Sequence, residues 1–142
     1  MLYTELTKKA MKIAFEAHKE QMDKSGIPYI YHPIHLAEQM EEERTVCVAL
    51  LHDVVEDTDI TFQQLQAEGF SEEVIEALKL MTRDDLTPYL DYIRKIKGNP
   101  IASAVKIADL KHNSDLTRLD EMDEEAFQRI KKYKKAMEIL ME

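Results

Sequence analysis

Apolar residues recur at three- and four-residue spacing through most of the chain, which is the pattern of helices that bury one face. This spacing predicts a first helix from about Tyr3 to Gln21, whose buried face would contain Leu6, Ala10, Ile13, Ala14 and Ala17. It also predicts a last helix that starts after Asp123 and carries the apolar residues Phe127, Ile130, Tyr133, Met137 and Leu140. No segment has a convincing strand pattern, so the chain favours an all-α fold.

Helix-capping and helix-breaking residues divide the chain between these two helices. Gly26 and Pro28 predict a loop in "DKSGIPYIYHP", and Pro33 suits the first turn of a short helix through residues 34–40. Later starts are predicted by a Thr61–Gln64 capping box, a Ser71 cap, a Thr87 cap before Pro88, and the Asn99–Pro100 pair. Together with only three glycines and four prolines, these signals predict an all-α domain of about six to eight helices.

The segment 44–57, "RTVCVALLHDVVED", is apolar almost all round and predicts the central buried helix. Titratable residues are concentrated at its C-terminal end. His52 and Glu56 are four residues apart, as are Asp53 and Asp57, so a continuous helix would align them in two columns along one edge. Acidic residues at a helix C-terminus oppose the macrodipole, which disfavours a purely structural role.

A histidine beside a carboxylate can begin a divalent-metal site, but further ligands must come from other segments. Asp109 and Asn113 lie four residues apart in an apolar helical pattern, "KIADLKHN". An unpaired buried carboxylate is costly, so Asp109 is expected to have a partner. His32 immediately precedes a predicted helix, where a capping role and a ligand role fit the local sequence equally well.

The other histidines and two tyrosines fit structural roles better. His35 is one turn beyond His32 and could form an H-x-x-H pair with it, although a surface or packing role suits it better. His18 and His112 are expected to make structural hydrogen bonds, and Tyr89 and Tyr92 are expected in the core.

Composition and charge narrow the class of protein. A length of 142 residues suits one domain, and the net charge of −9 disfavours binding to nucleic-acid polymers. The single cysteine, Cys47, lies within "VCVALL" and is expected to be a buried thiol. No apolar run is long enough to span a membrane and the N-terminus has no signal-peptide core, so we expect a cytoplasmic protein.

Three motifs in order, "GIPYIYHPIHLAE", "ALLHDVVEDTDIT" and "AVKIADLKHNSDL", resemble those of the HD-domain phosphohydrolases. Within that family they resemble the hydrolase module of RelA/SpoT homologues and the small alarmone hydrolases, over roughly residues 5–120. The resemblance implies an HD-domain helical bundle, with residues 1–142 forming a single HD-type domain. It implies hydrolysis without the separate synthetase activity of bifunctional relatives.

The resemblance also implies a role for each matched residue. The metal ligands would be His32, His52, Asp53 and Asp109, a mixed nitrogen and oxygen set that suits Mn²⁺, with Fe²⁺, Zn²⁺ or Mg²⁺ as alternatives. Glu56 and Asp57 would handle the attacking water, and Asn113 would contact the nucleotide ribose or phosphate. Apart from the matched residues, Lys24 and Lys106 are expected to bind the substrate, and these two with Lys111 or Arg118 could compensate for arginines of the family that this chain lacks.

The chain departs from the alarmone hydrolases at Asp23, Leu110 and Asp115, where those enzymes usually have arginine. Because the metal and catalytic positions still match, the leading hypothesis is a guanosine-3′,5′-bis(diphosphate) 3′-pyrophosphohydrolase-like enzyme acting on a small phosphorylated nucleotide. The altered cation positions leave two alternatives open. One is an HD-domain phosphatase for a nucleoside monophosphate or an NADPH-like nucleotide, and the other is a non-catalytic nucleotide-binding sensor. The oligomeric state is left open by the sequence.

Overall fold

The computed structural model describes residues 1–142 and contains α-helices, one short 3₁₀ helix and no strand, which confirms the all-α class. Its elements are α1 (Glu5–His18), α2 (Tyr31–Glu38), α3 (Glu43–Leu51), α4 (Val54–Asp57), α5 (Phe62–Ala67), α6 (Glu72–Met81), α7 (Tyr89–Lys97), α8 (Pro100–Asn113), the 3₁₀ helix η1 (Leu116–Arg118) and α9 (Glu124–Met141).

Most helix starts follow the predicted caps. The Thr61 capping box, the Ser71 cap and the Asn99 cap before Pro100 are all present. The Thr87 cap is wrong, because Pro88 is the N-cap of α7 and the Thr87 hydroxyl instead donates to Asp84. The capping box that starts α1, formed by Thr4 and Thr7, was not predicted from the sequence.

The predicted continuous helix over residues 44–57 is wrong. Helix α3 ends at Leu51, and α4 begins at Val54. Between them Asp53 adopts a non-helical conformation with φ −106° and ψ 0°. His52 is the C-cap of α3 and Asp53 the N-cap of α4, so the two columns expected on one helix do not exist. This extra break brings the number of α-helices to nine.

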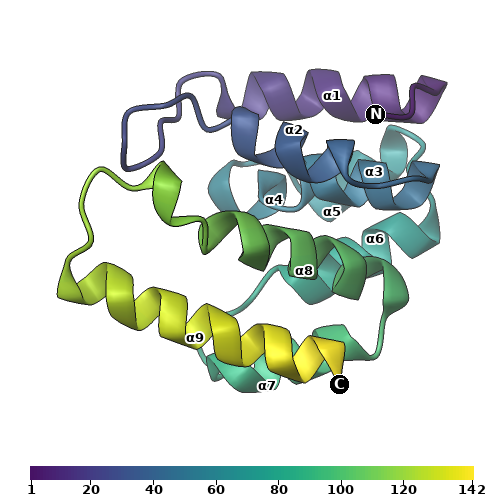
Figure 1. The fold of residues 1–142 in the computed structure, drawn as a ribbon. Coiled ribbons are helices and arrows are strands. Elements are labelled where there is room, and N and C mark those ends of the chain that lie inside the picture. The colour runs from purple at the N-terminus through teal and green to yellow at the C-terminus, as the bar shows by residue number, and fades with distance from the viewer.

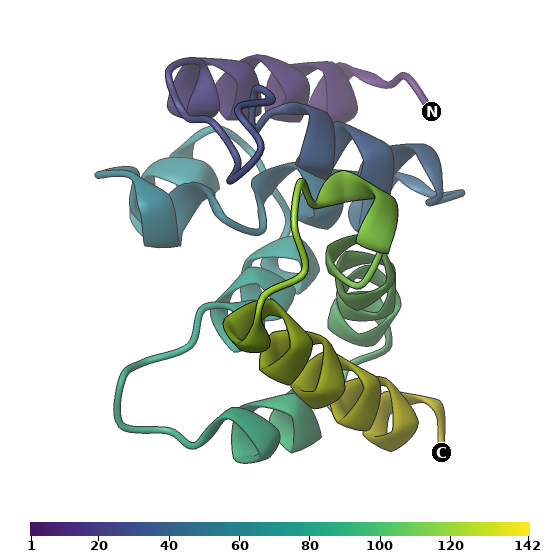
Figure 2. The same cartoon turned by 60° about the vertical axis from the view of Figure 1, so that its left-hand side comes forward.

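Helix α3 occupies the centre of the bundle. It packs against α1 and α2 on one side and against α6 and α8 on the other. Figures 1 and 2 show α1 and α2 together at one end of the molecule, α7 and α9 at the other, and α8 between them. Every residue from Val46 to Leu51 is at most 1% exposed, so this helix carries the densest part of the core. Because α3 is buried along this length, the residues that follow Leu51 begin in the interior of the bundle, and His52 is itself buried.

Cys47 is buried in this core, as predicted. Burial raises the pKa of its thiol to about 12, so the reactive thiolate is scarce near neutral pH. No helix combines the length and the apolar character that crossing a bilayer requires.

The replacement Leu50→Ala should destabilise the protein by about 2–5 kcal/mol, because Leu50 is fully buried and its loss leaves a cavity in the central helix. Urea denaturation measures the change. Leu86→Ala is the matched control, since Leu86 is 93% exposed between α6 and α7. Equal stability of the two variants would contradict the central position of α3.

Candidate metal centre and adjoining cleft

The break after Leu51 fixes the imidazole of His52 in one orientation. Nδ1 of His52 lies 2.7 Å from the carbonyl oxygen of Ala49, one turn earlier, and therefore donates its proton to it. In the neutral ring, Nε2 then carries the lone pair. This Nε2 is buried and makes no hydrogen bond, although it lies 3.1 Å from Asp53 Oδ2 and 3.6 Å from Asp109 Oδ1.

The side chains of His32 and Asp109, which come from two other helices, lie close to His52 Nε2. His32 Nε2 lies 2.8 Å from Asp109 Oδ1, and both side chains are buried, at 4% and 5% exposure. His32 lies in the first turn of α2 rather than immediately before that helix, as the sequence predicted. Asp109 is in the last half of α8. Ligand atoms of His32, His52 and Asp109 all lie within 4.8 Å of one another.

The Asp109 carboxylate is held by three donors on two helices. Its Oδ2 accepts from Lys106 Nζ at 2.9 Å, one turn earlier on α8. Its Oδ1 accepts from Asn113 Nδ2 at 3.1 Å, in addition to its contact with His32. The Lys106 ammonium holds the pKa of Asp109 well below its usual range, in spite of the burial that acts in the opposite direction.

Asp53 borders the cluster beside His52. Tyr29, from the loop before α2, donates its hydroxyl to Asp53 Oδ2. Burial alone would raise the pKa of Asp53, but His52 and the Tyr29 hydrogen bond lower it to about 2. Burial would likewise lower the pKa of His52, but Asp53 and Asp109 outweigh it and raise that pKa above its ordinary value. The negative potential at His52 thus favours a positive charge.

These groups fit a divalent cation. A lone pair on His52 Nε2 that faces two carboxylates is unfavourable unless a proton or a metal ion lies between them. Two imidazoles and carboxylates form the mixed donor set that first-row divalent metals accept. The cluster of His32, His52 and Asp109 could therefore hold such an ion, with Asp53 adjacent.

Glu56 and Asp57 follow the cluster on α4 and are exposed. Partial removal from water and then the charges of Asp53 and Asp57 raise the pKa of Glu56. Asp57 Oδ2 accepts a hydrogen bond from Gln21 Nε2 at 3.2 Å, which ties α4 to the loop after α1. The pair thus lies between the buried cluster and that loop.

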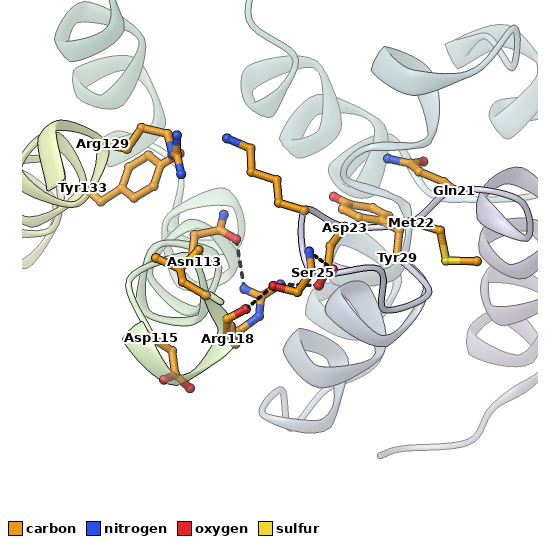
Figure 3. A pocket seen from close by; sticks show the side chains of 12 residues that line it. Gln21, Met22, Asp23, Ser25, Tyr29, Asn113, Asp115, Arg118, Arg129 and Tyr133 are labelled. Atoms are coloured by element: carbon orange, nitrogen blue, oxygen red, sulfur yellow. Dashed lines mark hydrogen bonds and ion pairs between the residues drawn. The ribbon is translucent and has the colours of Figure 1, made fainter. Parts of the chain in front are cut away.

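A cleft of about 380 Å³ lies between this loop and the C-terminal part of the chain. Figure 3 shows Gln21 and Tyr29 on one side, Arg129 and Tyr133 from α9 on the other, and Asn113 and Arg118 between them. Three cations, Lys24, Arg118 and Arg129, line it against two acids, although the whole chain has a net charge of −9. A cleft of this size and charge suits a small anionic ligand.

Arg118 offsets the acidic residue at position 23. Its Nη2 lies 3.9 Å from Asp23 Oδ2, while Nη1 donates to the His112 carbonyl at 2.8 Å and to Asn113 Oδ1 at 3.2 Å. The Asp23 carboxylate also accepts the backbone N–H groups of Ser25 and Ile27, so it shapes the loop.

The other two positions at which the alarmone hydrolases usually have arginine are Leu110 and Asp115, and both have structural roles here. Leu110 is fully buried in the core rather than facing the cleft. Asp115 caps η1 by accepting from Thr117. Positions 23 and 115 thus bring two acids to the cleft, and Arg118 offsets the acid at position 23, whereas position 110 is not a cleft position in this chain.

The predicted substrate-binding residues lie in different places. Lys24 and Asn113 line the cleft, whereas Lys106 does not line it and is paired with Asp109. His35 is exposed and stacks on His112, with ring centroids 4.0 Å apart. His18 is buried and bonds to Gln21 through Nδ1 at 2.8 Å, which agrees with the structural hydrogen bond expected of it.

Comparison with known proteins decides the family. The family model described as "HD domain" matches residues 10–138. The chain belongs to the HD-domain family.

Curated relatives of this HD domain include two larger bacterial proteins. The guanosine-3′,5′-bis(diphosphate) 3′-pyrophosphohydrolase of Aquifex aeolicus is 38% identical over 85 residues, which cover 57% of this chain and 12% of that protein. The bifunctional (p)ppGpp synthase/hydrolase SpoT of Escherichia coli K12 is 34% identical over 121 residues, which cover 75% of this chain and 17% of that protein. The chain therefore spans less than a fifth of either relative.

A solved structure shares the fold of this HD domain along nearly its whole length. It is described under the words "A metazoan ortholog of SpoT hydrolyzes ppGpp and plays a role in starvation responses". The TM-score is 0.76 with 24% identity, and the match covers 99% of this chain and 88% of the other. The HD-domain helical bundle expected from the motif resemblance is thereby confirmed.

Two residues that contact the cluster of this HD domain were not predicted as part of it. Tyr29 lies in the loop three residues before His32 and donates its hydroxyl to Asp53, 24 positions further along the chain, so no local spacing indicated the contact. His112 was expected to make only a structural hydrogen bond, yet its Nδ1 lies 2.7 Å from Nδ1 of His32. Burial and then the nearby Arg118 lower the pKa of His112 to about 4, so its ring is neutral near pH 7.

Removing the buried carboxylate by Asp109→Ala should cost about 3–5 kcal/mol of stability in metal-free protein, because Lys106 then keeps a largely buried charge without its partner. Urea denaturation in the presence of EDTA measures this. Asp120→Ala, which removes an exposed acid, should change stability by no more than about 0.5 kcal/mol. A loss below about 1 kcal/mol for Asp109→Ala would contradict the buried ion pair as a stabilising contact.

Proposed function

We propose that this HD domain is a divalent-metal-dependent phosphohydrolase, and that it releases pyrophosphate from guanosine-3′,5′-bis(diphosphate). The observation that carries the proposal is the buried, uncommitted Nε2 of His52, which faces Asp53 and Asp109 beside a cation-lined cleft. Residues 1–142 would act as one HD unit, in keeping with the family match over residues 10–138.

His32, His52, Asp53 and Asp109 would hold the metal ion. Mn²⁺ is the first candidate because two imidazoles and two carboxylates offer a mixed nitrogen and oxygen shell, with Fe²⁺, Zn²⁺ and Mg²⁺ as alternatives. A bound ion of this kind lowers the pKa of coordinated water and polarises phosphoryl oxygens. Tyr29 would fix the orientation of Asp53 through its hydroxyl, and Lys106 would fix Asp109.

Glu56 and Asp57 would orient the attacking water and accept its proton. A carboxylate with a raised pKa is a better base near neutral pH, and the pKa of Glu56 is raised by partial burial and by its acidic neighbours. Asp57 accepts a hydrogen bond from Gln21, which lines the cleft, and would thereby hold α4 beside the cleft. Both carboxylates are exposed, and the hydrogen bond from Gln21 engages only one oxygen of Asp57, so each carboxylate keeps an oxygen available to water.

The substrate would lie in the cleft between the loop before α2 and helix α9. Lys24, Arg118 and Arg129 would face its phosphates, and Asn113 would contact the ribose or a phosphate. The names of the two bacterial relatives support a guanosine bis(diphosphate) as the ligand. Lys106 would act on the substrate only through Asp109, since its ammonium is already paired.

A second candidate keeps the metal centre and changes the ligand. Asp23 places a carboxylate in the cleft at a position where the resemblance leads us to expect arginine, and this favours a nucleotide with less negative charge. A nucleoside monophosphate or an NADPH-like nucleotide would fit that condition. A sensor that binds a nucleotide without turnover is the remaining alternative.

Incubation of the purified protein with Mn²⁺ and each nucleotide separates these functions. ³¹P NMR should detect pyrophosphate released from guanosine-3′,5′-bis(diphosphate), and EDTA should abolish the release. Orthophosphate from another nucleotide would support the phosphatase, and calorimetric binding without product would support the sensor.

The replacements His52→Ala and Glu56→Gln should separate metal binding from proton transfer. His52→Ala should lose both Mn²⁺ binding and turnover, because the variant lacks Nε2, the nitrogen without a hydrogen bond whose lone pair would bind the ion. Glu56→Gln should bind Mn²⁺ normally yet lose turnover by on the order of 10²- to 10⁴-fold, the usual contribution of a general base. Metal titration and initial rates measure the two effects, with Asp59→Asn as an exposed acidic control on the same segment. Full activity of Glu56→Gln would rule out its role as the base.

Arg118→Ala should raise KM more than it lowers kcat, because the variant exposes the substrate phosphates to an uncompensated Asp23. Loss of a hydrogen bond to a charged group costs about 1.5–3 kcal/mol, so KM should rise by at least roughly tenfold. Steady-state kinetics measure the change, and Arg94→Ala on α7 is the control, since Arg94 lines none of this cleft. An unchanged KM would contradict the placement of the phosphates beside Arg118.

A further inference from the structure

His112 is the one histidine that contacts a member of the buried cluster from outside it. Its Nδ1 lies 2.7 Å from Nδ1 of His32. The two ring planes differ by only 4° and the centroids are 5.0 Å apart. That separation matches the nitrogen–nitrogen distance plus the two ring radii, so the rings meet nitrogen to nitrogen within nearly one plane rather than face over face. This is the in-plane geometry of a strong N–H···N hydrogen bond.

Only one of the two Nδ1 atoms can carry the shared proton. His32 points its other nitrogen, Nε2, at the cluster, 2.8 Å from Asp109 Oδ1. In the metal-free protein this Nε2 donates to Asp109, so a metal ion that takes the Nε2 lone pair displaces that proton. The proton of the neutral, metal-bound His32 ring must then be on Nδ1. His112 Nδ1 must then be the acceptor, with the His112 proton on Nε2.

The surroundings of His112 hold its ring in place for this contact. His35 stacks on it with ring centroids 4.0 Å apart and an interplanar angle of 26°. Arg118 donates to the His112 carbonyl at 2.8 Å, which ties the last turn of α8 to η1. His52 has an equivalent partner in the Ala49 carbonyl, which takes its Nδ1 proton. With an ion bound to both Nε2 atoms, each imidazole of the cluster would thus have a defined acceptor for the nitrogen that faces away from it.

We propose that His112 is a positioning residue of the metal centre, which accepts the Nδ1 proton of His32 and thereby keeps His32 Nε2 free to bind the ion. The proposal rests on the metal centre of the proposed function. It adds a fifth side chain, which contacts neither the metal ion nor the substrate. Partners of this kind fix the tautomer and orientation of a ligating histidine.

Two replacements separate an acceptor role from a packing role. His112→Phe keeps an aromatic ring for His35 to stack on but has no acceptor. His112→Asn loses the ring but places its side-chain oxygen where Nδ1 of histidine lies, because both atoms are bonded to Cγ. An acceptor role predicts that Asn rescues and Phe does not, whereas a packing role predicts the reverse. His35→Ala is the control for the loss of stacking alone.

Calorimetric titration with Mn²⁺ is the test. His112→Phe should bind on the order of 10- to 100-fold more weakly than the unaltered protein, the usual effect of removing such a partner. His112→Asn and His35→Ala should stay close to the unaltered protein. Urea denaturation of each metal-free variant monitors folding. Equal Mn²⁺ affinity of His112→Phe and the unaltered protein would overturn the proposal but leave the metal centre intact, whereas no Mn²⁺ binding by the unaltered protein would overturn both.

A second measurement needs no variant. In ¹⁵N-labelled protein loaded with diamagnetic Zn²⁺, the histidine ¹⁵N shifts should show protonated Nδ1 for His32 and unprotonated Nδ1 for His112. The opposite assignment, with the proton on Nδ1 of His112, would overturn the proposal even if His112→Phe failed to fold.

Discussion

The buried carboxylate of Asp109 is the group on which the rest of the site depends. It is almost fully removed from water and is stabilised by Lys106, Asn113 and His32. A charge in such a place is tolerated only when its lone pairs are matched by donors. Here those donors come from α8 itself and from α2, so the same contacts that make Asp109 tolerable also fix the distance between the two helices.

The break between α3 and α4 supplies the second half of the site. In a continuous helix the Ala49 carbonyl would accept the backbone N–H of Asp53. The Nδ1–H of His52 would then compete with that N–H for the same carbonyl. Because α3 ends at Leu51, His52 can donate to the Ala49 carbonyl and present Nε2 inward, and Asp53 can receive the Tyr29 hydroxyl. The densely buried residues 46–51 anchor this arrangement, so the polar end of the segment is held as firmly as its apolar part.

The charge of the cleft differs from the charge of the chain. Lys24, Arg118 and Arg129 gather around a cavity in a molecule whose net charge is −9. Like charges brought together on folding cost free energy unless an anion or an acid offsets them, and Asp23 offsets only part of this cluster. The distribution therefore fits a protein that attracts a phosphorylated ligand to one face.

The sequence alone determined the helical class, most of the caps, the buried Cys47 and the segments that carry His32, His52, Asp53 and Asp109, because these depend on local periodicity and residue chemistry. It did not determine the break at Asp53, since the apolar pattern of residues 44–57 is the same for one helix as for two. The contacts of Tyr29, His112 and Arg118 were also out of reach of local reasoning. The contacts of Tyr29 with Asp53, of His112 with His32 and of Arg118 with Asp23 join residues 24 to 95 positions apart, and only tertiary packing brings such residues together.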